Sequence, residues 1–147
     1  MADELNIYHN KRKIINDPVY GFISIPTDLI YDLLDHPYFQ RLRRIRQLGL
    51  TFYVYPAANH NRFQHALGAA HLMNTALDVI ARKGYQLTEM ERESAVAAIL
   101  LHDIGHGPFS HALEHSIVEN VDHETLSILY MEHLNRQFNG ALETAME

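Results

Sequence analysis

The chain has 147 residues, which is enough for one domain with a hydrophobic core but not clearly for two. It contains no cysteine, which excludes disulfides and thiolate metal sites, and we expect a cytoplasmic protein. The formal net charge of −6 argues against a generally basic nucleic-acid surface. The polar, acidic start is unlike a signal peptide, and no apolar run approaches the roughly 18–20 residues that span a bilayer.

The first predicted elements are a hairpin and a helix. Two β-prone runs within residues 13–25 flank turn residues between Asp17 and Gly21, which predicts a short hairpin. Thr27 is placed to cap a helix that continues to about residue 34. That helix ends before Pro37, because proline disfavours the helical conformation of the residue before it.

The remaining predicted elements are helices, identified by apolar residues at intervals of three and four and by capping residues. They cover residues 39–48, 61–82, 88–101, 109–118 and 122–138. Thr88 begins a capping box, Asp122 is placed to cap the last helix, and residues 50–58 form an irregular aromatic connection. The sequence therefore predicts a mainly α fold with a short N-terminal β-hairpin.

The segment 100–111 carries the clearest chemical signal, and five of the 11 histidines fall between His102 and His123. An apolar helix ends there on an adjacent histidine and aspartate, His102 and Asp103. A buried carboxylate must be paired or metal-bound, because burying a lone charge costs several kcal/mol. Imidazole with carboxylate is a ligand set for a catalytic divalent metal. Alternatively, Asp103 caps backbone or pairs with an arginine while His102 packs in the core.

A third ligand is available upstream. His65 lies 37 residues before His102, near the start of the long predicted helix. Two antiparallel helices joined by the loop around residues 83–88 would bring His65 next to the His-Asp pair. Metal sites in helical bundles are built in this way, from side chains on facing helices. Read alone, a histidine at a helix start more commonly bonds to backbone.

Five segments in this order and spacing resemble the HD-domain metal-dependent phosphohydrolases, in the deoxynucleoside triphosphate triphosphohydrolase-like branch. They are residues 16–21, 39–49, 60–65, 102–111 and 123–124. The resemblance implies an HD-domain helical bundle in which residues 1–147 form a single domain truncated at its C-terminal side. Residues 1–60 would supply the N-terminal hairpin and helices, and residues 61–140 the core helices.

The resemblance implies that His65, His102 and Asp103 hold one divalent metal ion, with Fe, Mn, Zn, Mg or Ni all open. The fourth ligand of the family is an aspartate on a later helix, and no aspartate follows Asp122 in this chain. We therefore expect the chain to be the N-terminal piece of a longer protein, with the fourth ligand beyond Glu147. Such a piece could be inactive by itself.

The resemblance also implies a reaction, the hydrolysis of deoxynucleoside triphosphates to deoxynucleoside and triphosphate. The residues expected to act at the α-phosphate are His106, Glu114 and His123. Those expected to bind substrate are Gln47, Leu48, Arg62 and His111. Related enzymes often carry aspartate where this chain has Glu114, so the carboxylate of this chain lies one methylene further from the backbone.

A regulatory nucleotide site is implied at a subunit interface, which predicts a homo-oligomer. The residues that match it are Lys13, Asn16, Asp35, Gln40 and Arg43. A capped turn and solvated helix residues would explain the same positions without a regulatory role.

Two other function classes remain open. A non-catalytic HD module could bind nucleotide or single-stranded nucleic acid, through the arginines of residues 41–46 and the aromatic residues Phe52, Tyr53 and Tyr55. A solvated helix face paired with acidic neighbours would equally explain those arginines. Residues 111–115 spell the His-x-x-Glu-His pattern of inverted zinc proteases, which leaves His65 and the His-Asp pair unexplained.

Overall fold

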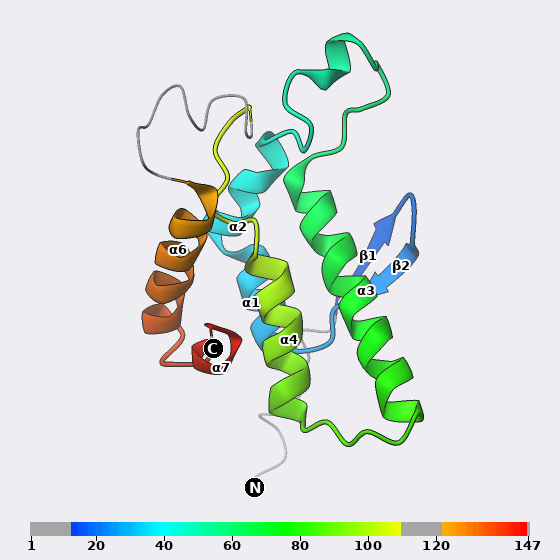
Figure 1. Ribbon diagram of the computed structural model, residues 1–147, viewed down its shortest axis with the longest axis vertical. Coiled ribbons are helices and arrows are strands. Elements are labelled where there is room, and N and C mark those ends of the chain that lie inside the picture. The colour runs from blue at the N-terminus through cyan, green and yellow to red at the C-terminus, as the bar shows by residue number, and fades with distance from the viewer. Residues whose placement is uncertain (1–12, 110–121, 147) are drawn as a thin grey trace, which may run out of the picture.

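The computed structural model describes residues 13–109 and 122–146, and the helices α3 and α4 lie at its centre (Figure 1). Helix α3 spans Arg62–Arg82 and α4 spans Glu89–Leu101. The two run antiparallel and pack along each other, joined by the loop of residues 83–88 (Figure 1). The first turn of α3 and the last turn of α4 therefore lie at the same end of the pair.

Local capping explains where these two helices begin. The Asn61 side chain accepts a hydrogen bond from the Gln64 backbone N–H, and the Gln64 side chain accepts one from the Asn61 N–H, both at 3.0 Å. Thr88 and Glu91 form the same reciprocal arrangement at the start of α4. Each box satisfies backbone donors that a helix start leaves without partners. The capping box at Thr88 confirms the sequence prediction.

The N-terminal hairpin consists of β1, Ile14–Asp17, and β2, Gly21–Ser24, paired antiparallel. The Asp17 carboxylate closes the turn by accepting hydrogen bonds from two turn N–H groups, at 2.8 and 3.0 Å. Because side chains alternate across a strand, Ile23 faces the helices and is 2% exposed. The hairpin is where the sequence predicted it.

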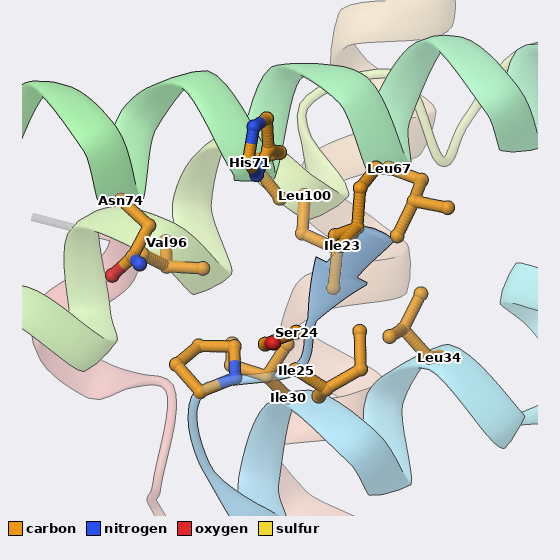
Figure 2. A pocket seen from close by; sticks show the side chains of 12 residues that line it. Ile23, Ser24, Ile25, Ile30, Leu34, Leu67, His71, Asn74, Val96 and Leu100 are labelled. Carbon is orange, nitrogen blue, oxygen red and sulfur yellow. The ribbon is translucent and has the colours of Figure 1, made fainter. Parts of the chain in front are cut away.

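Helix α1, Asp28–Asp35, packs against α4. A cavity of about 20 Å³ lies between the hairpin, α1, α3 and α4 (Figure 2). Its lining is mostly apolar and includes Ile23, Ile30, Leu67 and Leu100. A space of this size holds about one water molecule, so the hairpin is closely packed on the helices.

The segment that follows α1 differs from the prediction. Instead of one helix over residues 39–48, the structure has the short α2, Pro37–Gln40, and a 3₁₀ turn, η1, Arg41–Arg44. The backbone of residues 45–47 then pairs with residues 60–62, through hydrogen bonds of 2.8 and 3.0 Å. This pairing ties the chain to the start of α3 and prevents helical continuation.

The C-terminal part contains α6, His123–Gln137, and α7, Glu143–Met146. The Asp122 carboxylate caps α6, as predicted, by accepting a hydrogen bond from the Thr125 N–H at 2.6 Å. Between η1 and α3, a single 3₁₀ turn, η2, Thr51–Tyr53, interrupts the aromatic connection. The predicted helix over 109–118 lies almost entirely outside the described residues.

The described elements form a mainly helical molecule with one short hairpin, as predicted. Buried apolar side chains from all of its parts form one core. Its most deeply buried members include Leu33, Phe39, Leu42, Ala66, Ala97, Leu100, Ile104 and Leu134. Among the described helices, none combines the length and the apolar character needed to cross a membrane.

We predict that Thr88→Ala lowers the free energy of unfolding by about 1 kcal/mol, because it removes the cap of α4. Urea denaturation followed by circular dichroism measures this change. Thr75→Ala is the matched control: the Thr75 hydroxyl donates to a carbonyl within α3, at 2.9 Å, so its loss should change stability by less than about 0.5 kcal/mol. Equal losses of stability from the two substitutions would contradict the assignment of Thr88 as the cap of α4.

Candidate functional site

Asp103 is the charged centre of the site and lies in the turn of residues 102–106 that follows α4. Its carboxylate Oδ2 lies 2.5 Å from Nη1 of Arg62, the first residue of α3, and the two side chains are 12% and 2% exposed. Burial alone would raise the pKa of Asp103, but the hydrogen bond with His106 and the charges of His102 and Arg62 hold it well below its usual range. Asp103 is therefore ionised at neutral pH.

Two histidines face this carboxylate, one at the start of α3 and one directly after the end of α4. His65, in the first turn of α3, has Nε2 at 3.7 Å from Oδ2 of Asp103. His102 has Nε2 at 3.4 Å from Oδ1. Donor atoms of all three residues lie within 4.8 Å of one another. Two ligands each about 2 Å from one ion lie roughly 3–3.5 Å apart, so these side chains need only small movements to share a divalent cation.

The ring orientation of His102 and the protonation of His65 also suit metal binding. Nδ1 of His102 lies 2.6 Å from the carbonyl oxygen of Ile99. A carbonyl only accepts hydrogen bonds, so Nδ1 carries a proton and Nε2, on the side of Asp103, is the ring nitrogen available to a metal. Burial lowers the pKa of His65, which favours the neutral form that binds a metal. The donor set therefore fits a divalent metal.

His106 and His123 form a second part of the site. The His106 side chain is 3% exposed, and its Nε2 lies 3.5 Å from Oδ1 of Asp103. Its ring stacks on that of His123, with centroids 3.9 Å apart and planes inclined by 14°. These two histidines and Asp103 also bring donor atoms within 4.8 Å. However, the lone pairs of parallel stacked rings point side by side rather than converging, which suits proton handling better than a second metal.

Of the four residues predicted to bind substrate, the structure describes three, and one of these, Arg62, lies beside Asp103. Arg62 pairs with Asp103, and Gln47 and Leu48 lie in the turn between η1 and η2. The Oε1 of Gln47 is buried without a hydrogen-bond partner, whereas Leu48 is 46% exposed. The turn packs on the chain that follows the His-Asp segment, since a Cβ added at Gly49 would lie 2.9 Å from the Phe109 carbonyl oxygen.

Some predicted residues lie outside the described part of the chain. His111 and Glu114 are among them, so their predicted roles in binding and catalysis remain predictions. The whole His-x-x-Glu-His pattern of residues 111–115 falls there as well.

A separate pocket of about 100 Å³ brings together four of the five predicted regulatory residues, Lys13, Asp35, Gln40 and Arg43. The Gln40 amide donates to the Leu34 carbonyl and accepts from Nε of Arg43, both at 2.7 Å. The Arg43 guanidinium also lies over a phenylalanine ring of α3, 3.6 Å from its centroid. The fifth predicted residue, Asn16, lies in β1 and is not part of the pocket lining.

Gly105 and Ser127 connect the turn to α6, a role that no motif in the sequence indicates. The Gly105 N–H donates to Oγ of Ser127 at 2.9 Å. A Cβ at Gly105 would lie 2.2 Å from the His123 carbonyl oxygen, so only glycine allows this approach. The available signal was the spacing of Ser127, four residues after His123 and hence on the same helix face.

Comparison with known proteins agrees with this geometry. The family model "HD domain" matches residues 62–144. A crystal structure of a phosphohydrolase from Bacteroides thetaiotaomicron is similar with a TM-score of 0.90 and 55% identity, over 92% of this chain and 34% of that chain. Deoxynucleoside triphosphate triphosphohydrolase SAMHD1 of Homo sapiens is 38% identical over 138 residues, which are 88% of this chain and 22% of that protein.

A third relative is the uncharacterised protein YwfO of Bacillus subtilis, 42% identical over 115 residues. That match covers 78% of this chain and 26% of YwfO. The chain thus spans about a third or less of the length of these relatives.

We predict that Asp103→Ala lowers the free energy of unfolding by about 3 kcal/mol, because it leaves the Arg62 guanidinium buried without this carboxylate. Asp78→Ala is the control, since Asp78 pairs with Arg92 but its side chain is 48% exposed. The control should cost less than about 1 kcal/mol. Chemical denaturation of the metal-free chain measures both, and comparable losses would refute a central role for the Arg62–Asp103 pair.

Proposed function

The chain belongs to the HD-domain family, and from this premise we propose that it is a metal-dependent phosphohydrolase acting on deoxynucleoside triphosphates, with deoxynucleoside and triphosphate as products. The convergence of His65, His102 and Asp103 from two antiparallel helices supports this proposal most directly. The substrate class follows the similarity to the triphosphohydrolase SAMHD1.

The proposed metal ligands are His65, His102 and Asp103, with a fourth ligand proposed from an aspartate further along the protein. A divalent cation would supply Lewis acidity, polarising a phosphoryl oxygen and acidifying water. Two of these ligands are already arranged for metal binding in the metal-free chain. The Ile99 carbonyl orients the ring of His102, and burial lowers the pKa of His65, which favours its neutral form. The ion could be Fe, Mn, Zn, Mg or Ni.

We assign proton handling to His106 and His123, with Glu114 as an additional acid, base or water-positioning residue. Burial lowers the pKa of His106, so this imidazole is neutral at physiological pH. In this form it can accept a proton while hydrogen-bonded to the ionised Asp103. Breaking the ester bond to the deoxynucleoside requires a proton on the leaving oxygen. The His123 ring stacks on that of His106, so both imidazoles are placed to take part in this proton transfer.

Substrate binding is proposed for Arg62, Gln47, Leu48 and His111. Arg62 places a positive charge beside Asp103, where it would attract phosphate oxygens. The side-chain amide oxygen of Gln47 is buried and accepts no hydrogen bond from the described residues, so it could accept one from a hydroxyl group of the sugar. Leu48 would add an apolar contact to the deoxyribose.

The pocket lined by Lys13, Asp35, Gln40 and Arg43 is proposed as part of a regulatory nucleotide site. At about 100 Å³ it is too small to enclose a nucleotide, since small-molecule sites usually measure about 300–1,000 Å³. A second copy of the chain would complete the nucleotide site. Asn16, in the hairpin beside this pocket, would add a further contact to the nucleotide. The proposed activator-bound form is therefore a homo-oligomer.

The activity is tested by measuring triphosphate release from a deoxynucleoside triphosphate with the longest natural form of the protein, loaded in turn with each divalent metal. We expect His102→Ala to reduce the rate by at least about 100-fold, because it removes a metal ligand. His71→Ala, on α3 but outside the cluster, should leave it within twofold. Absence of phosphoester or phosphoanhydride hydrolysis with every metal would overturn the proposal.

The regulatory site is tested by nucleotide titration of metal-free protein, in which turnover cannot interfere. We expect Arg43→Ala to weaken binding of the activating nucleotide, and the oligomerisation it causes, by at least about tenfold, because Arg43 lines the pocket. Arg44→Ala, the next residue in η1 but absent from the lining, is the control. Analytical ultracentrifugation with and without each nucleoside triphosphate reports the assembly. Indistinguishable behaviour of the two variants would refute this site.

A further inference from the structure

The turn of residues 102–106, which directly follows α4, presents three site side chains, those of His102, Asp103 and His106. The end of a helix leaves carbonyl groups without intrahelical partners, and buried groups of this kind must find others. The turn itself provides two bonds, from the N–H of Ile104 at 3.0 Å and from that of His106 at 3.2 Å. Two side chains from other elements form hydrogen bonds with further carbonyl and N–H groups of residues 102–106.

Ser127 of α6 is the first of these side chains. Its hydroxyl donates to the His102 carbonyl at 3.0 Å and accepts from the Gly105 N–H at 2.9 Å. Ser127 is 4% exposed, and both bonds go to the backbone of the turn. Since Ser127 lies one helical turn after His123, it links the backbone that carries the metal ligands to the helix that carries His123.

Arg41 of η1 is the second. Its Nη1 donates to the His106 carbonyl at 2.7 Å, and its Nη2 donates to the Ile104 carbonyl. The guanidinium lies over the ring of Tyr130 on α6, 5.0 Å from the centroid. One rigid planar group therefore holds two carbonyls of the turn while packing against the same helix as Ser127.

We propose that Arg41 and Ser127 are positioning residues of the metal site. They fix the turn and α6 relative to one another, and so set the spacing between Asp103, His102 and the His106–His123 pair. Neither needs to touch the metal or the substrate, because each acts through backbone groups. This inference rests on the proposed metal-dependent function and adds two residues that control its geometry.

A purely structural role would lower stability without changing the metal ligands, so the test reads the ligands directly. Co²⁺ is added to the longest natural form of the protein at a temperature well below unfolding, and the visible absorption spectrum and the dissociation constant of the Co²⁺ complex are measured. We expect Ser127→Ala to change the Co²⁺ spectrum and to weaken Co²⁺ binding by about tenfold or more, as is typical when groups supporting metal ligands are removed. Ser94→Ala, which alters a buried serine within α4, is the control and should leave both unchanged.

Arg41→Lys provides an independent second variant should Ser127→Ala fail to fold. Lysine keeps the charge but cannot hold two carbonyls with one planar group, so the same changes in Co²⁺ spectrum and affinity are expected. Arg44→Lys, in the same 3₁₀ turn but exposed, is its control. In the metal-loaded enzyme, both test variants should lower kcat more than they raise KM.

The outcomes separate this inference from the proposed function. Wild-type Co²⁺ spectra and affinities in folded Ser127→Ala and Arg41→Lys chains would overturn the positioning role, even if the wild-type protein hydrolyses deoxynucleoside triphosphates. Altered spectra with no hydrolysis by the wild-type protein would support the positioning role and overturn the reaction. If the longest natural form of the protein binds no Co²⁺, both would be overturned.

Discussion

The buried ion pair between Arg62 and Asp103 is the interaction on which the rest of the site depends. Burying either charge alone would be costly, and the two side chains pair when the first turn of α3 lies against the turn after α4. Once this contact forms, His65 is three residues from Arg62 and His102 is next to Asp103, so the two histidines face one another, with ring centroids 5.4 Å apart. The pair that joins the helices thereby also assembles the metal ligands.

Elements with local signals could be predicted from the sequence. The hairpin has its turn residues, α4 has the capping box at Thr88, and α6 has Asp122 before its first turn. These signals act within a few residues, so no knowledge of the tertiary structure is needed. The segment 39–48 could not be predicted in this way, because a pairing with residues 60–62 overrides its helical pattern.

In the candidate site, too, some features could be inferred from the sequence and others depend on the tertiary structure. The proximity of His65 to the His-Asp pair could be inferred, because two helices joined by a short loop must pack antiparallel. The partner of Arg62 could not, since its spacing of 41 residues from Asp103 carries no local pattern. Arg41 is one of four arginines within residues 41–46, and only the tertiary structure shows that it is the one that binds the turn.

The antiparallel arrangement of α3 and α4 has a consequence for the electrostatics of the site. Peptide dipoles add along a helix, giving a partial positive charge at its N-terminus and a partial negative charge at its C-terminus. The site lies where α4 ends and where α3 and α6 begin, so both kinds of helix end meet around Asp103. The carbonyl end of α4 favours a cation, and the amide ends of α3 and α6 favour an anion. The backbone alone thus provides a polarity that suits a metal ion on one side and phosphate groups on the other.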